Sequence, residues 1–417
     1  MPKFIKASVF TLILMLILAA CASVPTETAA PAETELSPTP EETTREATPS
    51  EIPTIEPFVP AEHPVGIRMV AGEAEFFLRG TSEAFTLRGT NYIHIVTTES
   101  GGLQDRLLGT ADFDPETIRR NFTRLSELGY NTVRIFLDAC SDGPTCIGRV
   151  DGTGLNPEYM DNVAHVMRIA KETGILLLLT SNDIPSGGGY AAISDRDPSA
   201  NPMVAHYRNG QMLTPSGQEA YRTYWSDIMN ALVERRADFD AVLAWQLFNE
   251  QWLFADQPPL SLDEGIFTGP NGVDYDLSDP QQKRDLAADS IALHIDSIRA
   301  IILEADPGAM VTMGFFAPQF PNATGIGGER FVDTAALVER DVVLDFWDIH
   351  AYPGDDLTFS EFMQNFGLEG STAKPVILGE YGGFESRYDS VEAAARAAGT
   401  WMAGFCEQGL EGYLYWT

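Results

Sequence analysis

The chain has 417 residues, of which 44% are hydrophobic, so it is long enough for one large domain or two domains of ordinary size. Its formal net charge is -33 at pH 7. A polyphosphate backbone would be repelled by this charge, which argues against a nucleic acid partner.

The N-terminus has the features of an export signal. Lys3 and Lys6 precede an apolar stretch, Ala7 to Ala20, that is too short to span a bilayer comfortably but suits the core of a signal peptide. The four residues ending at Cys21, Leu-Ala-Ala-Cys, resemble the lipobox of bacterial lipoproteins. The resemblance implies a signal peptide of residues 1–21 in which Cys21 is lipidated. An ordinary signal peptide, in which Cys21 has no role, is the alternative.

Residues 22–63 are dominated by Thr, Pro, Ala and Glu and carry almost no basic residue. A stretch of this composition cannot bury enough apolar surface to fold, so we expect a disordered linker. The signal and the linker together predict an exported protein that is held at the cell surface or extracytoplasmic membrane by its lipid anchor alone. We expect it to be a monomer.

From residue 64 onward, apolar runs typical of strands alternate with amphipathic runs typical of helices. Continuous apolar runs mark strands buried on both faces, as in a parallel sheet covered by helices. We therefore predict a single α/β domain at residues 64–417 with the (β/α)8 fold of a TIM barrel. A doubly wound open sheet is the alternative, weakened by the lack of a Gly-rich phosphate loop after the first strand. The eight predicted strands are residues 86–93, 132–138, 174–180, 242–250, 310–315, 345–352, 375–382 and 412–417.

Three of the intervening helices have clear start signals. Asp114-Pro115, Asn156-Pro157 and Asp279-Pro280 each place a capping side chain before a proline at the first helical position. Gly129 and Gly174 stand where helices should end. These signals support the alternation of strands and helices on which the barrel prediction rests.

The cysteines do not suggest a metal site. Cys140 and Cys146 flank a short loop, and export would permit a disulfide between them worth about 2 kcal/mol. Two free thiols are equally compatible with the sequence. Cys406 lies in an alanine-rich helical pattern and is expected to be a small buried hydrophobe. No CxxC or Cys/His cluster is present, so we expect neither a metal nor another cofactor.

In a barrel of this type, functional side chains gather at the carboxyl ends of the strands. Glu250 and Glu380 end the fourth and seventh predicted strands, and each is a carboxylate that is costly to bury without partners. Arg134 lies inside the second strand and therefore needs a buried anion, which a strand-end glutamate could supply. A structural ion pair is the alternative explanation for these charges.

The chain resembles glycoside hydrolase family 5 and its wider clan of retaining barrel enzymes. The resemblance rests on five ordered segments across residues 80–417, each of which would be weak alone. They are Leu-Gly-Tyr-Asn-Thr-Val-Arg ending at Arg134, Phe-Asn-Glu ending at Glu250, Asp-Ile-His-Ala-Tyr ending at Tyr352, Leu-Gly-Glu-Tyr-Gly around Glu380, and Tyr-Leu-Tyr-Trp ending at Trp416.

The resemblance implies that Glu250 is the general acid/base and Glu380 the nucleophile. Glu250 must then be protonated, so its pKa should be raised by burial near a second carboxylate, while Glu380 must stay ionised beside Arg134. In a retaining enzyme the two carboxyl groups lie about 5 to 5.5 Å apart. Asn249 would hydrogen-bond the sugar 2-hydroxyl, His350 would orient the acid/base, and Tyr352 would donate a hydrogen bond toward the nucleophile.

Substrate contacts are predicted for a further group of residues. Trp416 would form a stacking floor beside the cleavage point, and long segments at residues 183–215 and 251–279 would build the walls of the cleft. For Trp347, which alternates away from His350, we favour a role as hydrophobic filler. The other predicted substrate-binding residues are Trp252, Tyr92, Asn91 and Asn182.

Two features depart from the family. Many members have a histidine at the end of the third strand, where this chain has Thr180-Ser181-Asn182-Asp183, so Asn182 or Asp183 would contact the sugar instead. The sequence also stops at Thr417, directly after the eighth strand, so the barrel apparently lacks its final helix and we expect a fragment. The segment before Tyr92 looks closer to mannanase-like members than to typical cellulases.

The sequence therefore predicts a retaining glycosidase of the mannanase or cellulase type. Its substrate would be a β-linked polysaccharide, β-mannan or β-glucan, cleaved internally by double displacement with the glutamate pair. Two alternatives use the same barrel. One is a glycan-binding surface lipoprotein without activity, and the other is a transglycosylase.

Overall fold

The computed structural model describes residues 58–97, 103–141, 143–196, 208–316, 330–352, 358–371, 373–383 and 388–416. Residues 1–57 are outside this set, so the predicted signal peptide, the lipidation of Cys21 and most of the predicted linker lie outside the described residues. In the part of the chain that the structure describes, no helix combines the length and apolar character needed to cross a membrane.

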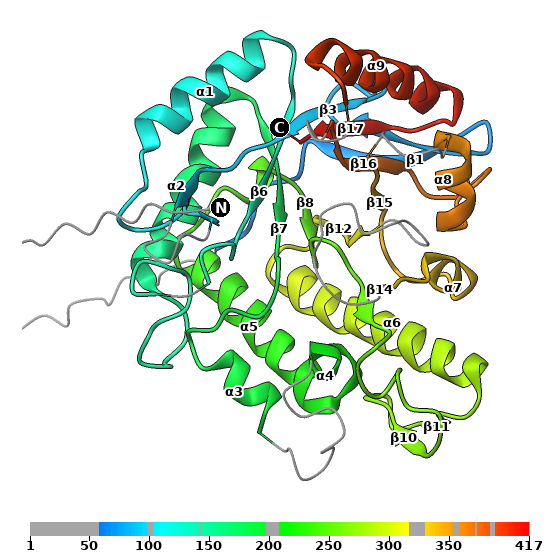
Figure 1. Ribbon diagram of the computed structural model, residues 1–417. Coiled ribbons are helices and arrows are strands. Elements are labelled where there is room, and N and C mark those ends of the chain that lie inside the picture. Colours follow the sequence, from blue (N-terminus) through cyan, green and yellow to red (C-terminus); the bar gives the residue numbers. More distant parts are fainter. Residues whose placement is uncertain are drawn as a thin grey trace, which may run out of the picture. The chain divides into compact units, whose positions relative to one another are not determined.

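The domain is a parallel β-barrel surrounded by helices (Figure 1). The strands pair in the order β12-β8-β7-β6-β3-β17-β16-β15-β13, and every pairing between neighbours is parallel. Because β12 and β13 are two pieces of one segment, interrupted at Met313, the two ends of the sheet meet and the barrel closes. The strands are β3 (Leu87–Asn91), β6 (Thr132–Phe136), β7 (Leu176–Thr180), β8 (Val242–Gln246), β12 (Met310–Thr312), β13 (Gly314–Phe315), β15 (Trp347–His350), β16 (Val376–Tyr381) and β17 (Gly412–Tyr415).

The eight predicted strands are confirmed, since each predicted range contains an observed strand or, for 310–315, the pair β12 and β13. Their continuous apolar runs are explained by burial on both faces, as in β6 and β8, where every residue is buried. The (β/α)8 prediction is therefore correct, and the doubly wound sheet is excluded.

Helices alternate with the strands and cover the outside of the barrel. Three begin as predicted, because the side chains of Asp114, Asn156 and Asp279 accept hydrogen bonds from backbone N–H groups of the first turn. Gly174 ends its helix in the left-handed conformation. The helices are α1 (Pro115–Glu127), α2 (Pro157–Thr173), α3 (Tyr190–Ser194), α4 (Arg208–Leu213), α5 (Pro215–Glu234), the 3-10 turn η1 (Phe239–Ala241), α6 (Pro280–Ala305), α7 (Thr334–Glu339), α8 (Phe359–Phe366) and α9 (Val391–Glu407).

A β-hairpin that sequence analysis did not separate from the barrel closes one end of it. Strands β1 (Val65–Val70) and β2 (Glu73–Leu78) pair antiparallel, and Phe76 packs edge-on against Phe346 at 5.2 Å between ring centroids. The hairpin and the starts of the barrel strands share one apolar cluster, formed by Val65, Phe76, Phe85, Leu87, Leu178, Leu243, Ala244, Met310, Phe346, Ile377 and Leu414. A side-chain cluster of this kind seals the amino-terminal end, so a site can open only at the carboxyl ends of the strands.

The segment before the hairpin is also tied to the barrel. The ring of Phe58 lies 5.9 Å from that of Phe239, and His63 is buried with its two ring nitrogens 2.9 Å from the Val242 oxygen and 2.7 Å from Asp306 Oδ1. The prediction that the linker extends to residue 63 is therefore wrong at its end. The packed domain includes residues from Phe58 onward.

Among the described residues, three short pairs of antiparallel strands lie in the connections beyond the carboxyl ends of the barrel strands. They arise in the long connections that follow β3, β8 and β13. The pairs are β4 (Ile95–Thr97) with β5 (Leu103–Asp105), β9 (Leu253–Phe254) with β14 (Arg330–Phe331), and β10 (Ile266–Thr268) with β11 (Asp274–Asp276).

Cys140 and Cys146 form a disulfide bond that closes the loop after β6. Cys406 lies in α9, as its alanine-rich pattern indicated. Trp347 is buried against Phe315, at 5.7 Å between ring centroids, which agrees with its interpretation as hydrophobic filler.

Candidate active site

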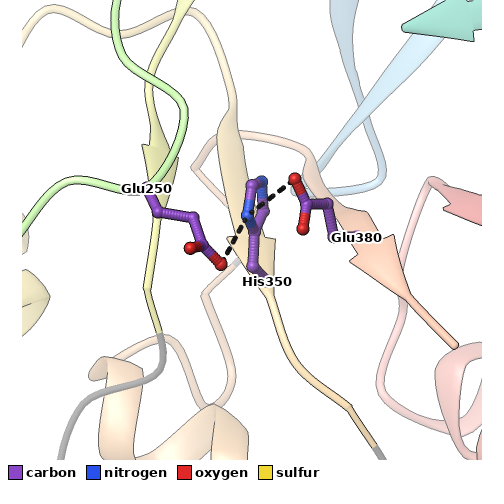
Figure 2. Close-up of side chains that lie close together, drawn as sticks. All are labelled: Glu250, His350 and Glu380. Atoms are coloured by element: carbon purple, nitrogen blue, oxygen red, sulfur yellow. Dashed lines mark hydrogen bonds and ion pairs between the residues drawn. The ribbon is translucent and has the colours of Figure 1, made fainter. Parts of the chain in front are cut away.

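Three ionisable side chains meet at the carboxyl ends of the strands (Figure 2). Glu380 lies in β16, His350 is the last residue of β15, and Glu250 follows β8 by four residues. One nitrogen of His350 and one carboxylate oxygen from each glutamate all lie within 4.8 Å of one another. The fold thus brings together residues that are separated by up to 130 positions in the chain.

Backbone hydrogen bonds fix the segment that carries Glu250. Leu247 N donates to Thr312 O at 2.8 Å, and Gln251 N donates to Gly314 O at 2.8 Å, so residues 247–251 continue alongside β12 and β13. Residue 314 must be glycine, because a Cβ there would overlap the backbone oxygen of Asn249. Glu250 is therefore positioned by strand-like contacts although it lies beyond the strand itself.

Both oxygens of the Glu380 carboxylate have protein partners. Arg134 Nη1 donates to Oε1 at 2.6 Å, and the Tyr352 hydroxyl donates to Oε2 at 2.6 Å. Glu380 is buried, and a buried carboxylate needs such charge-assisted bonds to remain ionised. These two contacts hold the negative charge and fix the plane of the carboxylate.

Arg134 is fully buried, and each of its five N–H donors has an acceptor. Nε and Nη2 donate to Gln246 Oε1 at 2.8 and 2.7 Å, and Nη2 also donates to Asn249 Oδ1 at 2.5 Å. Nη1 donates to Asn91 Oδ1 at 2.8 Å in addition to its bond with Glu380. The guanidinium is thereby locked, and the buried anion that it requires is Glu380.

The environment of Glu250 differs from that of Glu380. Burial raises the pKa of Glu250, and the positive charges of Arg330, Arg134 and Arg208 oppose this rise only in part. His350 lies between the two glutamates, with its Nδ1 3.3 Å from Glu250 Oε1 and 3.5 Å from Glu380 Oε1. Burial lowers the pKa of His350 to about 3, so the imidazole is neutral and adds no positive charge between the glutamates.

Two buried polar residues beneath the site were not predicted. Burial raises the pKa of Asp348 to about 8, so this carboxyl group is mostly protonated at neutral pH. Gln246 connects it to the site, because its Nε2 donates to Asp348 Oδ2 while its Oε1 accepts from Arg134. Two features of the sequence could have indicated that these residues lie near the site. Asp348 is two residues before His350 and so shares its strand face, and Gln246 interrupts an apolar run.

A second unpredicted carboxyl group supports the loop after β7. Asp138 accepts hydrogen bonds from Ser181 Oγ at 2.6 Å, from Asn182 N at 2.5 Å and from the Tyr224 hydroxyl at 3.0 Å. Burial raises the pKa of Asp138 to about 7. The loop that it supports carries Asn182, whose exposed side chain accepts from Asn249 Nδ2 at 3.2 Å. Asn182 and Asn249 thus lie side by side next to the glutamates.

Two residues predicted to contact the substrate have other partners within the protein. Both polar atoms of the buried Asn91 side chain are engaged, since Oδ1 accepts from Arg134 and Nδ2 donates to Gly379 O at 3.1 Å. Tyr92 points the other way, toward α1, where its ring packs against Phe122 and its hydroxyl accepts from Asn121 at 2.7 Å. Adjacent residues of a strand face opposite sides, so Asn91 and Tyr92 could not both reach the substrate.

The two predicted tryptophans remain near the site. Trp416 is partly exposed after β17, and its ring lies edge-on to Phe136 at 6.0 Å between centroids. Trp252 follows Glu250 by two residues and is 7% exposed, because two arginine side chains cover its ring. Trp416 is therefore available for stacking on a sugar, whereas most of Trp252 is covered.

Glu250, His350 and Glu380 are residue types that can hold a metal ion. In this arrangement both oxygens of Glu380 already accept hydrogen bonds, and a guanidinium lies 2.6 Å from the carboxylate. A divalent cation would have to displace one of these donors against the repulsion of Arg134. The donor set therefore fits proton transfer and nucleophilic attack better than metal binding.

Comparison with solved structures shows the fold of barrel glycosidases. The endo-1,4-β-mannanase of Rhizomucor miehei superposes with a TM-score of 0.55 at 17% identity over 84% of this chain and 90% of that one. An endo-β-1,4-mannanase of Thermotoga petrophila gives 0.53 at 17% over 80% and 68%, and an endocellulase of Pyrococcus horikoshii gives 0.50 at 15% over 85% and 91%. No protein-family model matches the chain, and no curated protein is similar to it in sequence.

Proposed function

We propose that the protein is a retaining β-glycoside hydrolase in which Glu380 is the nucleophile and Glu250 the general acid/base. The observation that carries the proposal is that the two neighbouring glutamates have different surroundings. Glu380 has two donors on its oxygens, one of them a buried guanidinium, while Glu250 lies within 4.8 Å of it with a raised pKa caused by burial. Carboxylate oxygens within 4.8 Å of one another fit the close spacing of a retaining enzyme better than the wider spacing that inversion requires.

In the first step, Glu380 attacks the anomeric carbon and forms a covalent glycosyl ester. The bond to the leaving oxygen breaks at the same time, and Glu250 gives that oxygen its proton. In the second step, Glu250, now ionised, takes a proton from water, and the resulting hydroxyl displaces Glu380. Two inversions at one carbon give net retention of configuration.

The neighbours explain why the two glutamates are suited to opposite roles. Arg134 and Tyr352 stabilise the charge of Glu380 before attack and again when it leaves. Asn249 is held by Arg134 through Oδ1, which leaves Nδ2 directed to Asn182 and toward the exposed side of the site. A sugar hydroxyl could replace Asn182 as its acceptor, which supports a contact with the 2-hydroxyl.

For the substrate we propose a β-linked polysaccharide cleaved internally. Mannanases and an endocellulase are among the similar solved structures, so β-mannan and β-glucan are the first substrates to test. We also propose, from the sequence of residues 1–63, that the enzyme is exported and anchored at the cell surface through Cys21. A monomer is sufficient for this chemistry, since the groups named above come from one chain.

The proposal is tested by turnover of the Glu380→Ala variant. We expect a loss of about four decades in kcat on mannan or glucan oligosaccharides, equivalent to about 5.5 kcal/mol of activation free energy. Near-normal hydrolysis by this variant would contradict the assignment. If the wild-type protein binds the oligosaccharides but releases no reducing ends, a glycan-binding role is favoured instead. If the products are longer than the substrate oligosaccharides, the protein is a transglycosylase.

A further inference from the structure

Two guanidinium groups lie over one aromatic ring beside Glu250. The Cζ atom of Arg208 is 4.4 Å from the centroid of the Trp252 ring, and that of Arg330 is 4.7 Å from it. Arg330 also stacks 3.7 Å from the Phe316 centroid. Each contact is favourable as a cation–π interaction, but the two positive charges repel each other. A pair of this kind is stabilised when an anion lies between or above the two groups.

The fold fixes the position of both arginines. Arg330 is the first residue of β14 and pairs with Phe254 in β9. Arg208 is the first residue of α4, and the next residue, Asn209, is fully buried. The Asn209 side chain accepts from Phe254 N and donates to Phe254 O, both at 2.8 Å. Three segments, which follow β7, β8 and β13, are thus joined into one platform.

The charge of Arg208 in this platform is only partly balanced by its neighbours. Arg208 Nε lies 3.6 Å from Asp183 Oδ2, which is too long for a hydrogen bond, and the Arg208 side chain is 27% exposed. Among the described residues no side-chain or backbone oxygen accepts a hydrogen bond from Arg208. Burial and the charge of Arg208 lower the pKa of Arg330, while Glu250 opposes this change. A local positive region therefore exists in a chain whose net charge is -33.

The platform adjoins the acid/base and not the nucleophile. Arg208 and Arg330 follow β7 and β13, which flank the segment that carries Glu250, whereas Glu380 lies on β16. Both arginines act electrostatically on Glu250. In the proposed mechanism Glu250 gives its proton to the leaving oxygen. A sugar substituent that contacts the two arginines beside Glu250 would therefore belong to the leaving sugar. A neutral mannan or glucan has no anionic group that could accept paired hydrogen bonds from the guanidinium groups of Arg208 and Arg330.

We propose that Arg208 and Arg330, supported by Trp252, bind an anionic group on the sugar at the leaving-group side of the cleavage point. A carboxylate at C6, as in a uronic acid, or a sulfate ester would accept bidentate hydrogen bonds from them. This inference rests on the proposed function and adds to it that the β-linked polysaccharide carries an acidic substituent, such as a carboxylate or sulfate on a mannan or glucan backbone.

Binding should be measured with the Glu380→Gln variant of the full-length protein, so that no probe is consumed. Three probes share one backbone, a cello-oligosaccharide: the unmodified form, a form with C6 carboxylates, and a form with C6 sulfates. A parallel set is made on manno-oligosaccharides. We expect at least about tenfold tighter binding of one anionic form than of the neutral form by titration calorimetry, and a weaker preference at high salt. The tighter anionic form identifies the natural group.

Further variants, made in the Glu380→Gln background, separate the platform from general charge effects. Arg208→Gln and Arg330→Gln should each lose most of the preference, whereas Arg208→Lys, which keeps the charge but not the planar fork, should retain part of it. Arg124→Gln removes an equal charge on α1, where Arg124 pairs with Glu127, and should leave the preference unchanged. Circular dichroism checks that each variant is folded, and if Arg330→Gln is not, the two Arg208 variants decide the question.

Equal binding of all three forms by the Glu380→Gln protein would overturn the inference, as would an undiminished preference in folded Arg208→Gln. These outcomes are distinct from failure of the proposed function. If the wild-type enzyme hydrolyses none of the probes but the anionic preference depends on Arg208, the binding site stands and the glycosidase assignment falls.

Discussion

Glu250 and Glu380 are the same residue type at the same end of one barrel, yet their surroundings are opposite. Glu380 lies within a strand and is 5% exposed, and both of its oxygens accept hydrogen bonds from donors that are themselves fixed. Glu250 lies on a connecting segment and is 16% exposed, and a neutral histidine lies 3.3 Å from one of its oxygens. One environment places a hydrogen-bond donor on each carboxylate oxygen, and the other raises the pKa of the carboxyl group through burial.

The difference shows how the fold gives two identical side chains different environments, which suits the two roles proposed for them. Glu380, within β16, forms an ion pair with the buried Arg134, whereas the segment beyond β8 contacts the same guanidinium through the amide oxygen of Asn249. The residue beyond β8 is left with burial as the main influence on its pKa. In the proposed mechanism, the partners of each carboxylate decide which one acts as the acid and which as the nucleophile.

The largest effect should come from removing the proton donor. Glu250→Ala should lower kcat on unactivated oligosaccharides by about two to four decades, because the leaving oxygen must then depart without a proton. With an aryl glycoside whose leaving group needs no proton, the first step should be nearly normal. Steady-state and pre-steady-state rates on both substrates test this contrast. Equal losses on the two substrates would mean that Glu250 is not the acid.

Removing the partner of Glu380 should affect stability as well as activity. Arg134→Met leaves a buried carboxylate with one donor, so we expect a loss of about 3–5 kcal/mol in the free energy of unfolding. Arg68→Met, which breaks the partly exposed pair with Glu75, is the matched control and should cost much less. Urea denaturation measures both. Similar losses of unfolding free energy in the two variants would show that the buried Arg134–Glu380 pair stabilises the protein no more than the partly exposed pair does.

Tyr352→Phe tests the second donor to Glu380. The change removes one hydrogen bond to Oε2 and leaves the ring in place, so kcat should fall by about 10- to 100-fold while folding is retained. Deglycosylation should slow less than the first step if the bond mainly orients the attacking carboxylate. An unchanged kcat would show that Arg134 alone is sufficient.

Of these variants, Asp348→Asn should have the smallest effect on activity. We expect it to change how the free energy of unfolding depends on pH. Burial raises the pKa of Asp348 to about 8, compared with about 3.9 in an unfolded chain. The folded state therefore binds more protons between these values, and stability falls as the pH rises through this window. Asparagine cannot titrate, so the variant should lose less stability than the wild type between pH 5 and 8. Parallel stability curves would contradict the shifted pKa.

Much of the barrel was predictable because its signals are local. Continuous apolar runs and proline-linked caps such as Asp114-Pro115 depend only on neighbouring residues, and they gave the strands and helix starts correctly. The pairing of Arg134 with a strand-end glutamate was also predictable, since a guanidinium inside a buried strand requires an anion.

Other features depend on contacts that no single segment contains. The sequence predicts a substrate contact for Asn91, but its side chain hydrogen-bonds Arg134 and Gly379 from two other strands. Arg208 and Arg330 meet at Trp252 only because β9 and β14 pair across distant loops. Asp348 could have been noticed from its alternation with His350, but its raised pKa follows from burial that the sequence does not display.

The central claim, that Glu380 is the nucleophile and Glu250 is not, is tested most directly by trapping the covalent intermediate. A 2-deoxy-2-fluoro glycoside with an activated leaving group slows both steps, and the second step slows enough for the glycosyl enzyme to accumulate. Mass spectrometry of a protease digest should then show one added sugar on the peptide that contains Glu380. A sugar on Glu250, or hydrolysis with inversion and no labelled peptide, would contradict the account.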